Sequence, residues 1–410
     1  MMANIPKIRF KGFTDDWEQC KFSEFVKNVA KKNKENLDLE PYAVTNDRGF
    51  IAQKDAHDDF GYMKDTDRKA YNIVPPNSFA YNPARINVGS LGYYTGAENV
   101  IVSSLYEVFQ TEEYIDDRFL WHWLKSDHFP KWIEKLQEGS VRLYFYFDKL
   151  VQCQMMIPLL EEQKQISTYL DNLDTLITLH QRKCDDTIEL KKYMLQKMFP
   201  QNGKKIPEIR FAGFTDDWEQ RKLEELYATI GNAFVGTATP YYVEDGHFYL
   251  ESNNVKDGQI NRNTEIFIND EFYEKQRDKW LHAGDMVMVQ SGHVGHATVI
   301  PDELDNTAAH ALIMFKNPKV NIEPYFLNYQ YQTSKSKKKI DNITTGNTIK
   351  HILASDMQKF AVDVPSYEEQ REIATYFRHL DHLITLHQRK CNALKEIKKY
   401  MLQNMFPQKG

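Results

Sequence analysis

PLLEEQKQISTYLDNLDTLITLHQRKCDDTIELKKYMLQKMFP runs from Pro158 to Pro200, and a near copy returns 207 residues later, from Pro365 to Pro407. Within it, the block Leu179–Cys184 is repeated letter for letter as Leu386–Cys391. Agreement of this length does not arise by chance. The chain therefore contains an internal duplication, which has to be recognised before any fold is assigned.

Apolar side chains in each copy step by four and three residues, the period of a helix that presents one narrow seam to another helix. A Pro and two Glu begin each helix and Phe-Pro ends it. About forty residues make a rod of roughly 60 Å, which cannot bury its seam alone. We expect the two seams to pair as an antiparallel coiled coil with a pseudo-two-fold axis; the alternative is that each helix packs only on its own neighbouring domain. The seam positions are Ile166, Leu170, Leu173, Ile177, His180, Cys184, Ile373, Phe377, Leu380, Ile384, His387 and Cys391.

A second duplicated block opens each half of the chain. Ile5–Gln19 returns as Ile206–Gln220, at an offset of 201 residues. Between the opening block and the helix lies a variable middle, so each half follows one plan. The predicted division is a first globular domain over 1–157, a long helix over 158–201, a second globular domain over 202–364 and a second long helix over 365–410.

Each variable middle mixes strand and helix signals. Short alternating runs bounded by Asp, Asn and Gly, such as Gly246–Ser252 and Asp285–Gln290, predict strands. The aromatic and Lys-rich stretches 117–136 and 324–343 each predict one helix, followed by a Gly-centred polar turn. The fold class is therefore mixed α/β, with two globular α/β domains separated by the two long helices.

Two Gly-rich loops occupy the same place in the two halves, at Val88–Gly92 and Ser291–Gly295. The sequence that leads into the strand before each loop differs between the two halves. The second half has the regular run Leu281–Val287, whereas the first half has Val74–Tyr81, with two prolines and an Asn. The two middles thus keep a common plan although their residues diverge.

Composition is that of an ordinary globular protein, with 41% hydrophobic and 27% charged residues. The chain shows no apolar leader and no apolar run of the eighteen residues that a membrane span needs, so we expect a cytoplasmic protein without membrane contact. Four cysteines without CxxC spacing predict reduced structural thiols. The net charge of −6 means that any surface for nucleic acid has to be local.

Motifs for catalysis are absent from the sequence. There is no GxxxxGK[ST] phosphate loop, HExxH, GxSxG or aromatic tetrad of the amino-methyltransferase kind. His293 and His296 on a Gly-rich loop are read as polar loop residues rather than metal ligands. His180 and His387 are read as seam histidines. The sequence thus predicts no catalytic residue, no metal and no cofactor.

With these repeats in view, the chain resembles the specificity subunit of type I restriction-modification systems over essentially its whole length. The motif Pro365–Ala374, PSYEEQREIA, and its first copy Pro158–Ile166, PLLEEQKQI, carry the resemblance. It implies that the middles are target-recognition domains, each reading one half of a bipartite target in double-stranded DNA. The helices would set the spacing and dock two modification (methyltransferase) subunits. Restriction subunits, which are ATP-dependent translocases and nucleases, would then join, so that all catalysis resides in other chains.

The competing interpretation is a non-enzymatic helical adaptor that binds proteins through its two globular domains. Polar and basic side chains on the Gly-rich loops favour DNA, because Arg, Gln, Asn and Lys reach base edges while Ser and Tyr more often contact phosphates. For each such residue, the alternative interpretation is a solvated loop residue without a ligand. The candidate DNA-binding residues are Arg85, Asn87, Ser90, Arg142, Tyr144, Gln290, Ser291, His293, His296, Asn347 and Lys350. A basic run at Lys335, Lys337, Lys338 and Lys339 would meet phosphates or form a solvated helix face.

Overall fold

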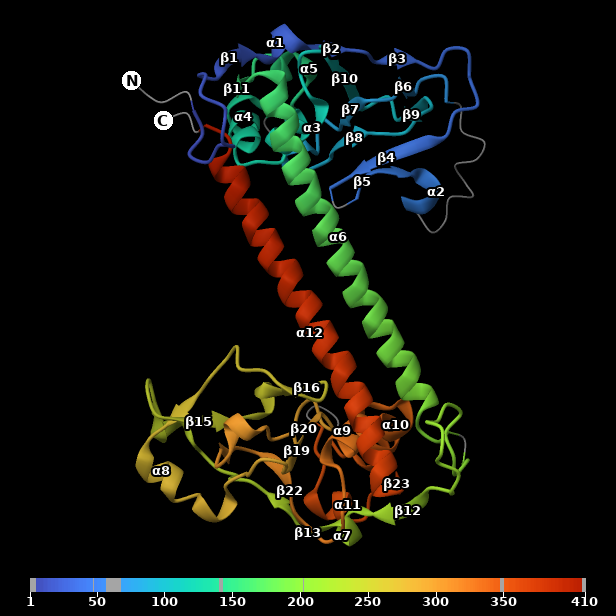
Figure 1. The fold of residues 1–410 in the computed structure, drawn as a ribbon, viewed down its shortest axis with the longest axis vertical. Helices are drawn as coiled ribbons and strands as arrows, with labels where there is room; N and C mark the ends of the chain where they lie inside the picture. Colours follow the sequence, from blue (N-terminus) through green and yellow to red (C-terminus); the bar gives the residue numbers. More distant parts are fainter. Residues whose placement is uncertain are drawn as a thin grey trace. The chain divides into compact units, whose positions relative to one another are not determined.

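The structure is a computed structural model that describes residues 5–46, 48–56, 68–139, 143–201, 203–346 and 350–407. It contains two compact units (Figure 1). The first unit comprises residues 1–180 with 389–410, and the second comprises 181–388. Each unit therefore holds one globular domain, the beginning of one long helix and the end of the other.

In the first unit, two sheets and a strand pair are combined with short helices. A four-stranded sheet has the order β2-β10-β7-β8, a five-stranded sheet the order β3-β6-β9-β4-β5, and β1 pairs with β11. The strands are β1 Glu18–Lys21, β2 Val26–Asn28, β3 Lys31–Lys32, β4 Pro41–Thr45, β5 Gly49–Ala52, β6 Asn72–Val74, β7 Ser78–Tyr81, β8 Leu91–Tyr94, β9 Val100–Val102, β10 Glu107–Thr111 and β11 Gln154–Ile157. The helices are α1 Phe22–Phe25, α2 Gln53–Ala56, α3 Asp117–Leu124, α4 His128–Leu136, α5 Phe147–Leu150 and the first long helix, α6 Leu160–Lys197.

The second unit repeats this arrangement around a sheet of order β13-β22-β19-β20 and the pair β12-β23, beside the sheet β14-β18-β15-β21 and the pair β16-β17. Its strands are β12 Glu219–Lys222, β13 Tyr227–Asn232, β14 Tyr242–Val243, β15 His247–Leu250, β16 Val255–Lys256, β17 Gln259–Ile260, β18 Phe267–Ile268, β19 Met286–Val289, β20 Ala297–Val299, β21 Ala308–Ala309, β22 Leu312–Pro318 and β23 Ala361–Val364. Its helices are α7 Leu223–Leu226, α8 Asp270–Glu274, α9 Pro324–Gln332, α10 Ser334–Ile343, α11 Ala354–Gln358 and the second long helix, α12 Tyr367–Asn404.

The segments that lead into β7 and β19 differ in sequence but share a left-handed residue at the equivalent position. Asn77 before β7 has φ +54°, and Gly284, 207 residues later and before β19, has φ +86°. Asn and Gly are the residues that most readily adopt this left-handed conformation. The prolines of the first half therefore precede the same kind of strand as the regular run of the second half.

The aromatic and Lys-rich stretch of each half forms two helices where the sequence predicts one. In the first unit α3 ends at Leu124 and α4 begins at His128. In the second unit the break falls at Thr333, whose hydroxyl accepts a hydrogen bond from Ser336 N at 3.2 Å. A Thr that caps a new helix satisfies a backbone donor that a continuous helix would use itself, so the helix restarts there.

An arginine from the opening block fastens each long helix to its own globular domain. Nε and Nη2 of Arg9 donate to the two carboxylate oxygens of Glu162 at 2.7 and 2.8 Å. Arg210 makes the same bidentate pair with Glu369, at 2.7 Å for both bonds. The side chain of each Glu is only 1% exposed. Because a buried carboxylate has to be paired, the Arg of one duplicated block and the Glu of the other recur together.

The glutamine that follows each of these Glu residues ties the helix start to two backbone segments. Nε2 of Gln163 donates to Pro158 O at 2.9 Å, and its Oε1 accepts from Asp116 N at 2.8 Å. Oε1 of Gln370 accepts from Glu323 N at 3.0 Å in the second unit. The second Glu and the Gln of each Glu-Glu-Gln motif thus position the helix, whereas the first Glu of each motif is exposed.

Half of the predicted seam residues lie in the cores of the globular domains. They are Ile166, Leu170 and Leu173 in the first unit, and Ile373, Phe377 and Leu380 in the second. The end of the other long helix completes each core: the rings of Phe406 and Phe119 lie 5.4 Å apart, and those of Phe199 and Phe326 lie 5.5 Å apart. The seam period thus correctly marks buried positions, and each is buried against its own domain.

Further along the helices, α6 and α12 contact each other within the first unit. The Cys391 thiol donates to Ile177 O at 3.9 Å, and Lys398 Nζ pairs with Asp174 at 2.5 Å. Residue numbers rise along α12 while they fall along α6, so the two helices are antiparallel here. This agrees with the antiparallel pairing expected from the sequence.

The second unit contains the matching helix pair. The Cys184 thiol donates to Ile384 O at 3.9 Å, and Lys191 Nζ pairs with Asp381 at 2.7 Å. All four residues stand 207 positions from their counterparts in the first unit, so the interaction itself is duplicated. The remaining seam residues are half-buried: Ile177, His180, Ile384 and His387.

One contact between helix and domain differs between the units. In the first, Arg118 on α3 forms an ion pair with Asp171 on α6, and His122 Nε2 lies 2.8 Å from the same carboxylate. Burial alone would raise the pKa of Asp171, but hydrogen bonds from His122 and Arg118 hold it well below its usual range. At the corresponding places the second unit has Tyr325 and Arg378, with the guanidinium 4.4 Å from the ring centroid.

Removing the Arg9 guanidinium should destabilise the first unit. In Arg9→Met the carboxylate of Glu162 stays buried without its charge partner, which costs about 3–5 kcal/mol. The control Lys27→Met removes an exposed pair with Glu112 at 3.6 Å, worth about 0–1 kcal/mol. Urea unfolding followed by tryptophan fluorescence measures both variants, and equal midpoints would contradict the assigned role of Arg9.

Candidate nucleic-acid interface

The loop between β7 and β8 carries three of the predicted site residues. Arg85 and Asn87 are exposed. Ser90 is buried, and its hydroxyl donates to Val44 O at 2.8 Å. Gly89 beside it has φ +91°, and a Cβ at this position would lie 3.4 Å from Asn46. Ser90 therefore anchors the loop on β4, while Arg85 and Asn87 are available to a ligand.

The segment after α4 lies beside this loop. Phe145 N donates to Pro83 O at 3.1 Å, and the backbone of Tyr144 pairs with Glu138. The Tyr144 and Tyr146 rings are parallel, with centroids 5.5 Å apart. A cleft of about 810 Å³ is lined by both tyrosines together with Arg85. Arg142, also predicted here, lies outside the described residues.

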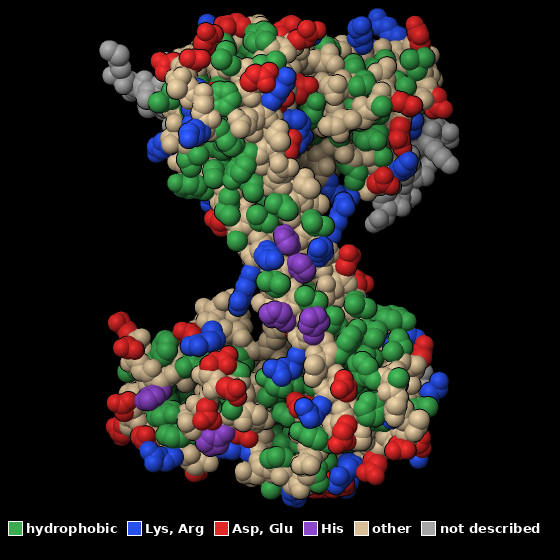
Figure 2. Space-filling view, in the orientation of Figure 1, with side chains coloured by type: hydrophobic (Ala, Val, Ile, Leu, Met, Phe, Trp, Pro, Cys, Tyr) green, Lys and Arg blue, Asp and Glu red, His purple; other side chains and the backbone are tan. Residues whose placement is uncertain are grey.

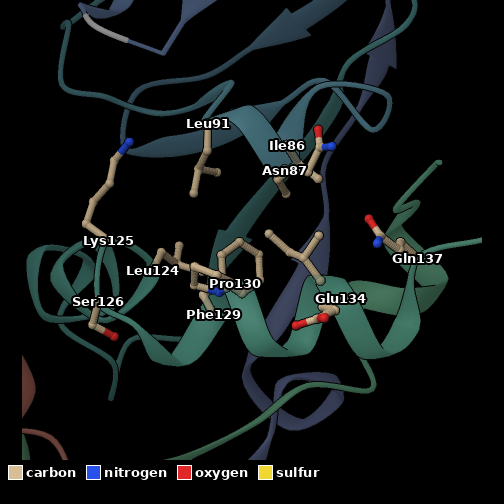
Figure 3. Close-up of a pocket in the computed structure, with 12 residues that line it drawn as sticks. Ile86, Asn87, Leu91, Leu124, Lys125, Ser126, Phe129, Pro130, Glu134 and Gln137 are labelled. Atoms are coloured by element: carbon tan, nitrogen blue, oxygen red, sulfur yellow. The ribbon is translucent and has the colours of Figure 1, made fainter. Parts of the chain in front are cut away.

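A smaller pocket of about 290 Å³ separates the β7–β8 loop from α4. Figure 3 shows Asn87 and Gln137 at one end of it, Lys125 and Ser126 at the other, and Glu134 along α4. Leu91 and Phe129 line it with apolar surface from opposite sides. Polar side chains therefore line the pocket at both ends, with Asn87 at one and Lys125 at the other.

In the second unit, two histidines fasten the equivalent loop between β19 and β20. His293 Nε2 donates to Ser252 O at 2.9 Å, and His296 Nδ1 accepts from Asp257 N at 3.1 Å. Burial lowers the pKa of His296, although the charge of Asp257 opposes this. These histidines bind the loop to the segment before β16 and to the turn after it, so each has a structural partner.

The segment before α11 lies against the same loop. Gly292 N donates to Lys350 O and Ile352 N to Gln290 O, both at 3.0 Å. Lys350 is exposed, and its Nζ lies 3.0 Å from the Asp341 carboxylate. The Oε1 atom of Gln290 is buried with no partner within the described ranges. Ser291 is half-buried on the loop, and Asn347 lies outside the described residues.

The predicted basic run on α10 divides into bound and exposed lysines. Lys335 pairs with Asp363 at 2.5 Å, and Lys339 donates to Ala361 O at 3.2 Å. Lys337 and Lys338 are exposed. The charges of Lys337, on α10, and Lys256, on β16, both contribute to lowering the pKa of His296. Lys256 carries no motif that would mark it in the sequence.

Comparison with known proteins identifies the family. The model of the type I restriction modification DNA specificity domain matches residues 14–190 and again 215–396. The chain belongs to this family. Each match covers one half of the duplication, from the opening block into the long helix, so the family's unit and the chain's repeat coincide.

Two specificity-subunit relatives span nearly the whole chain. The type I restriction enzyme MjaVIII specificity subunit of Methanocaldococcus jannaschii is 24% identical over 95% of this chain and 91% of its own length. The putative type I restriction enzyme MjaX specificity subunit of the same organism is 22% identical over 97% and 95%. A crystal structure of a type I restriction-modification system S subunit from M. genitalium has a TM-score of 0.62 at 13% identity, covering 99% of this chain and all of that one.

One group of potential metal ligands occurs among the described residues of this specificity-domain protein. Atoms of His122, Asp171 and Asp174 lie within 4.8 Å of one another. Arg118 already pairs with Asp171, and Lys398 pairs with Asp174. The protein's own cations thus neutralise both carboxylates, which makes the group a salt-bridge network.

None of the described helices has the length and apolar character of a membrane span.

Acidification should weaken the anchoring of the β19–β20 loop. Because the pKa of His296 is lower in the folded state than the unfolded value of about 6.5, the folded state loses stability as pH falls below that value. In His296→Asn the amide oxygen can accept the Asp257 hydrogen bond without titrating. Thermal unfolding between about pH 7.5 and pH 5.5 should therefore cost wild type more stability than this variant.

The control for this measurement is His379→Asn, on an exposed position of α12. Its loss of stability on acidification should match that of wild type. Equal losses for wild type and His296→Asn would show that His296 does not anchor the loop through its neutral form.

Proposed function

We propose that this chain is the DNA sequence-recognition subunit of a type I restriction-modification complex. Residues 1–157 and 202–364 act as two target-recognition domains, each of which reads one half of a bipartite target in double-stranded DNA. Residues 158–201 and 365–410 set the spacing of the half-sites and dock two modification subunits. Restriction subunits join that complex, and methyl transfer and cleavage reside in the partner chains.

The observation that carries this proposal is the contrast between a repeated frame and divergent loops. The frame makes the same contacts twice, from the Arg9–Glu162 pair and its copy Arg210–Glu369 to the duplicated helix pair. Between them, the β7–β8 loop exposes Arg85 and Asn87. In the second unit His293 fastens the β19–β20 loop, and the exposed Lys350 lies on the segment beside it. Such a chain offers two different readers on one repeated support.

The exposed loop residues are suited to different parts of a duplex. Arg85 and Asn87 can pair with base edges in the major groove, where Arg prefers guanine and Asn prefers adenine. Lys337, Lys338 and Lys350 supply positive charge for phosphates around the second loop. The anchored residues, Ser90 and the two loop histidines, hold the loops in shape.

The alternative of a protein-binding adaptor accounts for the helices but not for the loops. Acidic and basic side chains are interspersed over the visible face of each unit (Figure 2). The stacked tyrosines and cations flank clefts in the first unit, beside the exposed loop. An adaptor would need no second, differently equipped loop at the equivalent position, so DNA recognition is favoured.

Exchanging residues 221–364 for the same segment of a relative should change one half of the target only. Each middle is an independent reader on a shared frame, so the other half-site stays as it was. Methylome sequencing of cells that carry the chain with its modification subunit measures both. Wild type should give a two-part motif with adenine methylation on both strands; a hybrid that changes both parts would contradict separate readers, and no methylation at all would favour the adaptor.

Four residues inserted after Gln201, just past the end of α6, should lengthen the gap between half-sites. One helical turn is about 5.4 Å, or roughly one and a half base pairs at 3.4 Å each. The expected gap is therefore longer by about one base pair, with both half-sites unchanged. The control carries the same four residues after Gly410. An unaltered gap in the methylome would mean that the helices do not set the spacing.

A further inference from the structure

A second, strongly basic cleft lies in the first unit, away from the tip of the β7–β8 loop. Its volume is about 690 Å³, and it is bordered by the β4–β5 turn, the end of α3 and the last turns of α12. The cations that line this basic cleft are Arg48, Lys125, Lys395, Lys398 and Lys399. Three segments far apart in sequence thus bring five positive charges to one surface.

Among the described residues that line the cleft, two carboxylates stand beside the five cations. Asp174 pairs with Lys398 at 2.5 Å, and Asp127 accepts a hydrogen bond from Gln403 at 3.0 Å. Lys395 and Lys399 are exposed and form no ion pair with any residue that the structure describes. Among the described lining residues, positive charge therefore exceeds negative charge.

Lys125 contacts an aromatic ring of the cleft and interacts with a second lysine. Its Nζ lies 4.6 Å from the centre of the Trp121 ring. Although Lys125 is exposed, desolvation by the atoms packed around it and next the charge of Lys398 lower the pKa of Lys125. Two lysines that line one cleft and act on each other in this way favour an anion between them, because an anion relieves their mutual repulsion.

The basic cleft continues into the pocket beside the exposed loop. Lys125 and Ser126 line both, and Asn87 lines the far end of that pocket (Figure 3). A ligand that contacts Asn87 with one part can thus reach Lys125 and the α12 lysines with the next. A duplex has this character, since it presents base edges and, beside them, one phosphate charge per about 1.7 Å of helix axis.

The repeat shows that part of this charge is not needed by the frame. At the positions 207 residues away, Gln332 stands in place of Lys125 and Ile188 in place of Lys395. Lys398 and Lys399 are matched by Lys191 and Lys192. The same helix pair therefore forms without Lys125 and Lys395, so these two lysines serve something specific to the first unit.

We propose that the basic cleft binds the phosphodiester backbone of duplex DNA, adjoining the bases contacted by the β7–β8 loop. The inference rests on the proposed function and adds a second contact region in the first unit. Lysines are compact point charges on flexible stems and bind phosphates without selecting a base. The cleft thus contributes affinity and salt dependence, while the loop contributes sequence preference.

The test is the double variant Lys125→Gln with Lys395→Ile, which installs the residues of the second unit. The full chain is assembled with its modification subunit and titrated with a duplex carrying the methylated motif and with a scrambled duplex. Two phosphate contacts fewer should reduce the slope of log K against log salt by about 1.8. Between about 50 and 200 mM salt, the Kd of the variant should therefore rise about 12-fold less than that of wild type.

The variant should weaken binding to both duplexes by the same factor and leave the methylated motif unchanged. The charge-matched control, Lys11→Gln with Lys131→Gln, removes two exposed lysines that line neither the cleft nor the pocket, and its slope should equal that of wild type.

An unchanged slope in the cleft variant would overturn the proposal. Loss of the modification subunit on size-exclusion chromatography without DNA, at an unchanged salt slope, would show that an acidic protein surface occupies the cleft and would overturn it too. Failure of the proposed function has a different signature, since the wild-type complex would then methylate no motif.

Discussion

The bidentate pair of Arg9 with Glu162, and its copy of Arg210 with Glu369, is the interaction on which the rest of the structure depends. It joins the two duplicated blocks, which are separated in each half by a middle whose sequence diverges from that of the other half. A carboxylate this deeply buried is stable only with a partner that meets both oxygens, and the planar guanidinium does so where an ammonium group would not. The glutamine beside each Glu then holds the chain before α3 or α9, so that one short motif orients helix, opening block and globular domain together.

The duplicated elements could be predicted from the sequence because their signals are local. The two helices, expected from Pro158 and from Pro365, begin at Leu160 and Tyr367 and end before the Phe-Pro stops. The four-and-three period marked the buried positions but not what buries them. Leu170 and Phe377 would satisfy that period against a helix or a domain equally well, and only the folded chain shows that a domain core receives them. Likewise, Asn77 and Gly284 are unlike in sequence but equivalent in backbone conformation.

The loops of the candidate interface could be located from the sequence. Whether each of their side chains faces solvent or fastens the loop could not be predicted. A Ser or His on a Gly-rich loop has the same appearance whether it faces solvent or fastens the loop, and Ser90, His293 and His296 prove to be fastened. The basic cleft had no signal at all. Its cations come from positions near 48, 125 and 395–399, and no rule of spacing relates segments that the tertiary fold alone brings together.

The contact between Arg118 and Asp171 has a consequence for how such proteins diversify. The equivalent place in the second unit pairs an aromatic ring with a cation, Tyr325 with Arg378. A first middle transplanted into the second slot would therefore face Arg378 with Arg118, and a second middle in the first slot would offer Asp171 no cation. Shuffling of recognition modules between genes should accordingly favour exchanges that keep each module in its original slot. The residues of the helices would then restrict each kind of module to its own half of the chain. New targets would arise by replacing a module with another of the same kind.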